Sequence, residues 1–177
     1  MQHGQAGIYA YSHLIDMSVY ELARKVNDAL CENGFTLSTA ESCTGGGIAA
    51  AITSVPGSSN VFKGGVVAYA NEVKNGVLSV TSDALREHGA VSEAVVCEMV
   101  CGVARLMQTD CAVATSGIAG PSGGTPEKPV GTVWVAIYIK GIIKTYLLTL
   151  DDCGRTVNIQ STIAETLRLL YALLREL

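Results

Sequence analysis

The sequence predicts an α/β protein, a three-layer α/β/α sandwich with a mixed sheet of about five or six strands. Strand-like and helix-like patterns alternate along the earlier part of the chain, which is typical of strands joined by crossover helices. Two strand-like runs, "TVWVAIYIK" and "IIKTYLLTL", then flank Gly141 and predict an antiparallel hairpin. A last segment repeats apolar residues at helical spacing and predicts a long helix that closes the fold.

The composition favours one compact domain and argues against two kinds of partner. The chain has 177 residues, of which 49% are hydrophobic and 16% charged, so it can bury a core of its own. Its net charge of −4, without any run of Lys and Arg, argues against a nucleic-acid partner. No uninterrupted apolar stretch reaches the ~18 residues of a membrane-spanning helix, so we expect no membrane partner.

The six cysteines are expected to be reduced thiols in a cytoplasm. The start "MQHGQAGIYAYSH" lacks the basic region and apolar core of a secretory signal, and disulfides are rare in the cytoplasm. Two of the cysteines lie four residues apart, but a zinc site needs further ligands and the histidines show no ligand spacing. We therefore expect neither a metal nor a cofactor. The residues concerned are Cys31, Cys43, Cys97, Cys101, Cys111, Cys153, His3, His13 and His88.

The helices and strands can be placed by periodicity and by their end signals. Residues 1–17 show no periodicity and are expected to form a tail or arm, so the domain comprises residues 18–177. Ser18 opens the first helix with Glu21 as the second half of a capping box, and Gly34 ends it. The remaining expected elements are a strand at 35–40, a helix at 46–53, a loop at 55–60, a strand at 64–70, helices at 71–80, 84–89 and 92–107, strands at 111–120, 132–140 and 142–150, and a helix at 157–177.

Two of these helices have expected N-terminal caps. Ser82 and Asp83 are the expected caps of the helix at 84–89. Ser92 is the expected cap of the next helix, although Val95 stands where a capping box would have Glu or Gln.

The stretch "TAESCTGGGIAA", residues 39–50, places Ser42 at a glycine-rich turn between a strand and a helix. Unpaired amides at such a turn, here those of Thr44, Gly45 and Gly46, can hold a phosphate or the oxyanion of a tetrahedral intermediate. A hydroxyl there can attack an acyl carbon if a base takes its proton. The alternative is that Ser42 and Thr44 only cap the helix.

Lys74 is the candidate base. It follows Tyr69 beyond the end of the second predicted strand, where the ends of parallel strands gather ligands. A lysine whose pKa is lowered by burial can accept a proton from a serine. Two alternatives stay open: Lys74 as a solvated helix residue, and His88, the one plausible histidine, as a base or a surface residue.

A second glycine loop, "TSGIAGPSGGTPEKPVG", begins at Ser116, Gly117 and Gly120 at the end of another strand. Such a loop can wrap a phosphate or ribose with its amides, or it can be only a flexible connection. Arg155 lies just before the last predicted helix, where a cation is electrostatically unfavourable unless it meets an anion. It is either a phosphate clamp or a partner of Asp151 or Asp152 in a surface ion pair.

Taken together, four segments resemble the C-terminal domain of the competence-damage-inducible protein CinA and its stand-alone relatives, the nicotinamide-nucleotide amidases (PncC). These segments are "AESCTGG", "PGSS..F.GGVVAY.NEVK..VL.V", "HGAVSE" and "SGIAGP.GGTPEKPVGTVW". The resemblance covers nearly all of residues 18–177. Before the last helix it departs from the family's "GDR..VR", because this chain has "DDCGRTVN" with Asn158 in place of a second arginine.

The resemblance implies a homodimeric amidase that converts nicotinamide mononucleotide to nicotinic acid mononucleotide and ammonia. It further implies Ser42 as nucleophile, Lys74 as base and Tyr69 as a residue that orients or relays the proton. Thr44, Gly45, Gly46, Ser116, Gly117, Gly120 and Arg155 are then the substrate-binding residues. Cys43 is expected to pack behind the turn. Two other functions stay open: a non-catalytic nucleotide-binding or regulatory module, and a cysteine hydrolase that uses Cys43.

Overall fold

The computed structural model describes residues 17–177, and the predicted arm lies outside these residues except for Met17. The order of helices and strands agrees with the order predicted from the sequence. The elements are α1 (Val19–Asn33), β1 (Leu37–Glu41), α2 (Gly47–Thr53), the short 3-10 helix η2 (Ser58–Asn60), β2 (Phe62–Val67), α3 (Asn71–Leu78), α4 (Ser82–His88), α5 (Glu93–Met107), β3 (Cys111–Gly117), β4 (Thr132–Ile139), β5 (Ile142–Thr149) and α6 (Arg155–Arg175).

The five strands form one mixed sheet in the order β2-β1-β3-β4-β5, which confirms the predicted fold class. Strands β2, β1 and β3 are parallel, so their carboxyl ends lie at the same edge of the sheet. Strands β4 and β5 form the predicted antiparallel hairpin. Its two-residue turn, Lys140-Gly141, has φ values of 49° and 93°, and positive φ at both positions matches the twist of the flanking strands.

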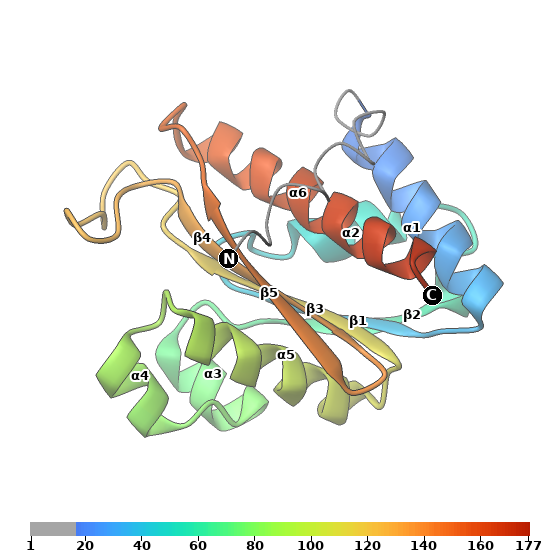
Figure 1. Cartoon of the computed structure of the whole chain (residues 1–177), viewed down its shortest axis with the longest axis horizontal. Helices are drawn as coiled ribbons and strands as arrows, with labels where there is room; N and C mark the ends of the chain where they lie inside the picture. Colours follow the sequence, from blue (N-terminus) through green and yellow to red (C-terminus); the bar gives the residue numbers. More distant parts are fainter. Residues whose placement is uncertain (1–16) are drawn as a thin grey trace, which may run out of the picture.

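Helices α1, α2 and α6 cover one face of the sheet, and α3, α4 and α5 cover the other (Figure 1). Each face has its own hydrophobic core, and β3 contributes to both by alternation: Val113 points into the first, Ala112 and Ala114 into the second. The small alanines let α5 lie close to the sheet. Close packing recurs at Gly102, where an added Cβ would lie 2.1 Å from the Leu78 carbonyl oxygen.

The ends of α1 follow from local sequence, as predicted. The Ser18 hydroxyl accepts from the Glu21 amide, and the Glu21 carboxylate accepts from the Ser18 amide, so the capping box is complete. Gly34 closes the helix with a left-handed φ of 66°. Between these ends, α1 buries a stripe that includes Leu22, Val26 and Leu30 against the first core.

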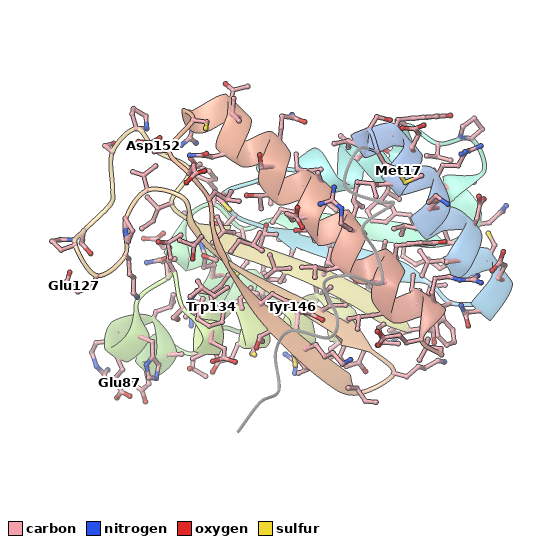
Figure 2. All side chains as sticks on the ribbon, turned by 45° about the horizontal axis from the view of Figure 1, so that its top comes forward. Met17, Glu87, Glu127, Trp134, Tyr146 and Asp152 are labelled. Atoms are coloured by element: carbon pink, nitrogen blue, oxygen red, sulfur yellow. The ribbon has the colours of Figure 1, made fainter. Side chains whose placement is uncertain are left out.

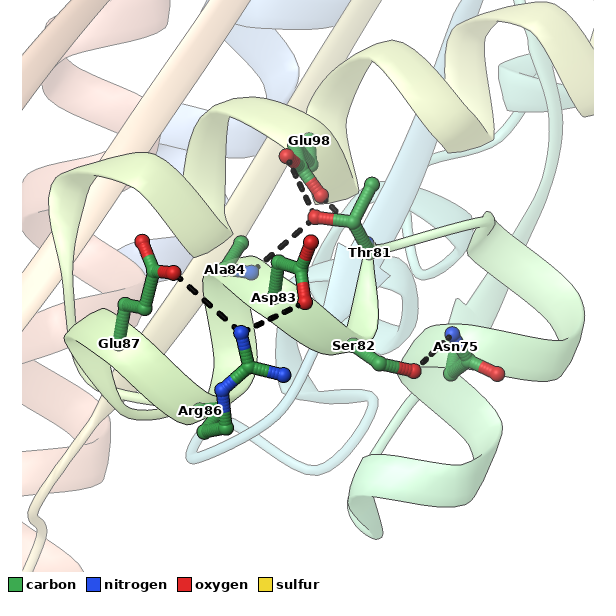
Figure 3. Close-up of polar contacts among 8 residues, drawn as sticks. All are labelled: Asn75, Thr81, Ser82, Asp83, Ala84, Arg86, Glu87 and Glu98. Carbon is green, nitrogen blue, oxygen red and sulfur yellow. Dashed lines mark hydrogen bonds and ion pairs between the residues drawn. The ribbon is translucent and has the colours of Figure 1, made fainter.

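The predicted N-caps of α4, Ser82 and Asp83, are wrong, because both residues lie inside the helix. Thr81 is the N-cap, and its hydroxyl accepts from the Ala84 amide. The Glu98 carboxylate of α5 accepts in turn from the Thr81 amide and hydroxyl, at 2.6 and 3.1 Å, and so fixes α4 to α5 (Figure 3). Ser82 instead accepts from Asn75, and Asp83 pairs with Arg86 within the helix. The long-range contact from Glu98 therefore selects the cap.

Other boundaries also differ from the prediction: β1, β2 and β3 are Leu37–Glu41, Phe62–Val67 and Cys111–Gly117, against the predicted 35–40, 64–70 and 111–120, and α3 ends at Leu78. Helix α6 begins at Arg155, two residues earlier than predicted, because Gly154 with a φ of 92° is the last residue outside the helical conformation. The predicted loop at 55–60 contains η2. Ser92 caps α5 as predicted, by accepting from the Val95 amide. Within residues 17–177, no helix has the length and apolar character needed to cross a membrane.

Candidate active site

The candidate site lies at the carboxyl ends of the three parallel strands. The chain leaves β1 and reaches β2 through α2 on one face, then crosses to β3 through α3, α4 and α5 on the other. Strand β1 lies between its two neighbours, so the segments that follow the three strands meet beyond this edge of the sheet. Ser42 follows β1 directly, Ala68 and Tyr69 follow β2, and Ser116 and Gly117 end β3.

Lys74 meets Ser42 at this edge of the sheet. The Lys74 Nζ lies 3.2 Å from the Ser42 Oγ, and it also donates to the carbonyl oxygens of Ala68 at 2.8 Å and Tyr69 at 3.4 Å. Only 1% of Lys74 is exposed, so the solvated alternative is wrong. Helix α3 begins at Asn71, shortly after β2, so Lys74 lies in its first turn. From there its side chain reaches the carbonyls of Ala68 and Tyr69 that follow the strand.

Burial lowers the pKa of Lys74 below its ordinary value of 10.5, because a buried ammonium loses its hydration. A neutral amine fits the contacts that the structure provides. Its two N–H groups match the two carbonyl oxygens, and its lone pair can then accept the Ser42 proton. The arrangement can therefore take a proton from Ser42 without a histidine. His88, the alternative base, is exposed at the end of α4.

Most backbone amides in the turn after Ser42 are already hydrogen-bonded within the protein. The Gly45 amide donates to the Ser42 carbonyl at 3.1 Å, and the Gly46 amide donates to the Glu41 carboxylate at 3.1 Å. The expectation of unpaired amides is therefore wrong at these two glycines. Among residues 17–177, the amides of Cys43 and Thr44 have no carbonyl or carboxylate acceptor. Gly45 is exposed, and a Cβ there would meet nothing within 4 Å, so the space beside the turn is open.

Glu41 is a residue that sequence reasoning missed. Its carboxylate is 1% exposed and accepts from three amides at the start of α2: Gly46 at 3.1 Å, Ile48 at 3.0 Å and Ala49 at 2.8 Å. A glutamate that ends a strand of buried small residues was the available signal. The N-terminus of α2 is therefore occupied by an internal anion, so of the two ligands considered for these amides a phosphate is disfavoured there.

The side chains that follow Ser42 point into the protein. The Thr44 hydroxyl is hydrogen-bonded to the Thr115 hydroxyl at 2.8 Å, and both residues are buried. Cys43 packs in the first core, as expected, and burial raises the pKa of its thiol to about 11. A protonated thiol is a poor nucleophile, so the site gives no support to a cysteine hydrolase.

The residues at the end of β3 also face inward. The Ser116 hydroxyl donates to the Ala90 carbonyl at 2.7 Å, and Ser116 is 1% exposed. A Cβ at Gly117 would lie 2.5 Å from a methyl group of Val133, so β3 and β4 approach too closely there for a side chain. These two positions support the loop that follows them.

Arg155 joins the second glycine loop to the segment after β2. Its guanidinium donates from Nη1 to the Gly120 carbonyl at 2.9 Å and from Nη2 to the Tyr69 hydroxyl at 2.8 Å. Within the described part of the chain it forms no ion pair, so the alternative of a pair with Asp151 or Asp152 is wrong. Tyr69 itself is 60% exposed.

The loop between β3 and β4 is held at both sides. Lys128 donates to the carbonyls of His88 and Val91 at 2.9 and 2.8 Å, and buried Asn158 donates to the Ala119 carbonyl at 3.1 Å. Figure 2 shows the loop that carries Glu127 and the turn that carries Asp152 projecting from the same end of the sheet. A shallow hollow lies between them. Asn158, where the resemblance would have a second arginine, thus supports the loop.

Neither the acidic and metal-binding side chains nor the cysteines form a further site in the described part of the chain. Among residues 17–177, no three His, Cys, Asp or Glu side chains are grouped so that they could hold a metal ion. All six cysteines lie in the described part of the chain, and each is a free thiol there.

Comparison with known proteins places this fold in a family. Residues 19–174 match the CinA C-terminal domain family. The chain belongs to this family. Crystal structures agree: a CinA-superfamily protein from Klebsiella pneumoniae is similar with a TM-score of 0.87 and 37% identity over 91% of this chain and 100% of that one. A competence/damage-inducible protein from Agrobacterium tumefaciens has a TM-score of 0.85 and 40% identity over 88% of this chain and 94% of that one.

Two kinds of curated relative match this CinA-family chain. The nicotinamide-nucleotide amidohydrolase PncC of Escherichia coli (strain K12) is 50% identical over 123 residues, which are 70% of this chain and 74% of that protein. A CinA-like protein of Thermotoga neapolitana is 52% identical over 126 residues, 71% of this chain but only 31% of that protein. The match thus spans about a third of the longer CinA-like relative.

Proposed function

We propose that this CinA-family protein hydrolyses the carboxamide of nicotinamide mononucleotide, giving nicotinic acid mononucleotide and ammonia. The observation that carries the proposal is the 3.2 Å contact between the Ser42 Oγ and the Nζ of buried Lys74. A module that only binds a nucleotide does not need a serine hydroxyl in contact with the amine of a buried lysine. The similarity to the PncC amidohydrolase supports the choice of substrate.

The first half of the reaction is acylation of Ser42. Neutral Lys74 accepts the hydroxyl proton as the Ser42 Oγ attacks the carboxamide carbon, and a tetrahedral oxyanion forms. The Thr44 amide, which has no carbonyl or carboxylate acceptor in residues 17–177, is the proposed donor to that oxyanion. Gly45 contributes by leaving the space beside it open, whereas a Cβ at Gly46 would contact the Val67 side chain at 3.4 Å. Lys74 then gives its proton to the leaving nitrogen, ammonia departs, and an ester with Ser42 remains.

The second half releases the acid. Lys74, again neutral, accepts a proton from water as the water oxygen attacks the ester carbon. The second tetrahedral intermediate collapses, the Ser42 oxygen leaves and takes the proton back from Lys74, and the acid product departs and loses its remaining proton to water. The carbonyls of Ala68 and Tyr69 hold the Lys74 nitrogen in place through both halves.

The nucleotide phosphate is proposed to bind near Arg155 rather than at α2. Helix α6 begins at Arg155 and has no side-chain cap, whereas the start of α2 is occupied by Glu41. An uncapped helix N-terminus together with a guanidinium attracts a phosphate. Gly120 and Tyr69 are bonded to this guanidinium and would border the nucleotide, while Ser116 and Gly117 support the loop beneath it.

The remaining alternative is a nucleotide-binding or regulatory module without catalysis. Ammonia release from nicotinamide mononucleotide separates the two functions, measured for the parent, Ser42→Ala and Lys74→Ala. We expect release by the parent and a loss of about three orders of magnitude or more in each variant. Thermal unfolding with and without ligand reports whether the variants fold and bind. A folded parent that is stabilised by the nucleotide but releases no ammonia would establish the binding module instead.

The oligomeric state and the cellular compartment of the protein are inferred in the same way. We infer a homodimer, which the family resemblance implies, and edge strand β5 offers exposed Ile142 and Leu147 as apolar surface for it. Light scattering of the eluting protein would show a single subunit mass if this inference is wrong. Free thiols at all six cysteines are consistent with a reducing cytoplasm.

A further inference from the structure

The buried carboxylate of Glu41 takes no part in the proposed catalytic steps, yet it forms three hydrogen bonds beside the nucleophile. It ends β1 immediately before Ser42, and its two oxygens accept from the amides of Gly46, Ile48 and Ala49. We propose that Glu41 is the positioning residue of the nucleophile, an internal anion that holds the Ser42 turn against α2. This inference rests on the proposed amidase function.

The chemistry of the contact requires a carboxylate. Two oxygens that can only accept face three N–H groups that can only donate. The negative charge also meets the positive end of the α2 dipole in a place that is 1% exposed, where water does not screen it. A carboxamide would direct its own N–H2 at one of those donors, and a shorter side chain would not span the turn.

The backbone of Glu41 is fixed as firmly as its side chain. Glu41 pairs with Val67 of β2 on one side and with Thr115 of β3 on the other. The next amide, that of Ser42, donates to the Thr115 carbonyl at 3.0 Å. With strands on both sides and α2 above, the chain has little freedom to move Ser42.

Glu41 is also linked to the base. The Glu41 carbonyl accepts from the Ala68 amide at 2.8 Å, and the Ala68 carbonyl accepts from the Lys74 Nζ at 2.8 Å. A shift of the chain at Glu41 would therefore move the nucleophile and disturb the peptide that orients its base. Small errors in such distances reduce the rate of the chemical step strongly.

The primary test is Glu41→Gln, assayed for ammonia release under saturating and limiting substrate. We expect kcat to fall at least about tenfold with KM within about twofold, because positioning of Ser42 matters in the transition state and not for binding. A folded variant with kcat within about twofold of the parent would overturn the proposal. A parent that releases no ammonia would instead overturn the proposed function on which it rests.

Asp110→Asn is the matched control for general loss of stability. The Asp110 carboxylate also accepts from a backbone amide, that of Thr36 at 2.9 Å, but it lies at the opposite end of β1. We expect a clear loss of thermal stability with kcat within about twofold of the parent. An equal fall of kcat in both variants would show that weakening of β1, and not positioning by Glu41, lowers the rate.

Glu41→Asp keeps the proposal testable if Glu41→Gln does not fold. It retains the charge but shortens the reach by one methylene, so the turn must shift toward the strand. We expect a reduced kcat with unchanged KM. A kcat equal to that of the parent would show that the position of the carboxylate does not matter, and the proposal would fail.

Discussion

Arg155 and Tyr69 stand 86 residues apart in the chain, and a 2.8 Å hydrogen bond joins the Arg155 Nη2 to the phenol oxygen of Tyr69. The same guanidinium holds the Gly120 carbonyl. One side chain thus connects the start of α6, the loop after β3 and the segment that leads from β2 to Lys74. In this structure the Tyr69 hydroxyl contacts Arg155, and it is the Tyr69 carbonyl that contacts Lys74.

Replacing Arg155 should weaken binding of the substrate phosphate. We expect Arg155→Gln to lower kcat/KM for nicotinamide mononucleotide by roughly 10- to 100-fold, the size of a lost charge-assisted contact. The Ki of phosphate-free nicotinamide riboside as a competitive inhibitor should change by less than about threefold, since it lacks that contact. Arg86→Gln on α4 is the control and should change neither. Equal losses for both ligands would place the phosphate elsewhere.

The lowered pKa of Lys74 predicts how the rate depends on pH. Only the neutral amine can accept the Ser42 proton, so kcat/KM should rise with pH in a one-proton step whose midpoint lies below 10.5, the ordinary value for lysine. The profile of ammonia release against pH measures this midpoint. A rate that falls over the same range would mean that the ammonium, and not the amine, is the active form.

The same shift predicts how stability depends on pH. Between the lowered pKa in the folded state and 10.5, the unfolded chain binds more protons at Lys74 than the folded chain. The free energy of unfolding should therefore rise with pH through this window. Lys74→Met should remove that component, which denaturant titrations at several pH values would detect. An unchanged slope in the variant would assign the effect to another group.

Cys43 should be dispensable for catalysis. Its thiol is buried with a pKa raised to about 11, so Cys43→Ala should keep kcat within about threefold of the parent. The variant should lose only about 1 kcal/mol of stability from the small cavity it creates. Treatment of the parent with iodoacetamide should leave activity largely intact. Loss of activity in the alanine variant together with rapid inactivation of the parent would restore the cysteine mechanism.

Two helical glycines should respond to alanine in opposite directions. A Cβ at Gly102 would lie 2.1 Å from the Leu78 carbonyl oxygen, so Gly102→Ala must push α5 away from α3 and should cost roughly 1–3 kcal/mol. A Cβ at Gly76 of α3 meets nothing within 4 Å, and Gly76→Ala should stabilise the protein by about 0.5–1 kcal/mol. Chemical denaturation of both variants measures the difference. Equal effects would contradict the close contact of the two helices.

Local sequence was sufficient for the elements whose ends are set by neighbouring residues. The Ser18–Glu21 capping box and the left-handed Gly34 bound α1 without any distant partner. The hairpin of β4 and β5 follows from two apolar runs around Gly141. The helix ends depend on residues three or four apart, and the hairpin depends on its two-residue turn, so neighbouring residues are enough to specify them. For the same reason the order of helices and strands, and hence the fold class, could be predicted.

The tertiary structure decided what the chemically interesting residues do. The sequence alone could not separate a solvated Lys74 from a buried one, because that depends on where α3 lies after β2 has paired with β1. Nor could it show that the Glu41 carboxylate accepts from amides at the start of α2. That contact exists only because the chain after Ser42 turns back toward the end of β1. Burial and charge contacts depend on segments that are distant in sequence. The order of the elements was therefore set locally, and the environments of Ser42, Lys74 and Arg155 were set by packing.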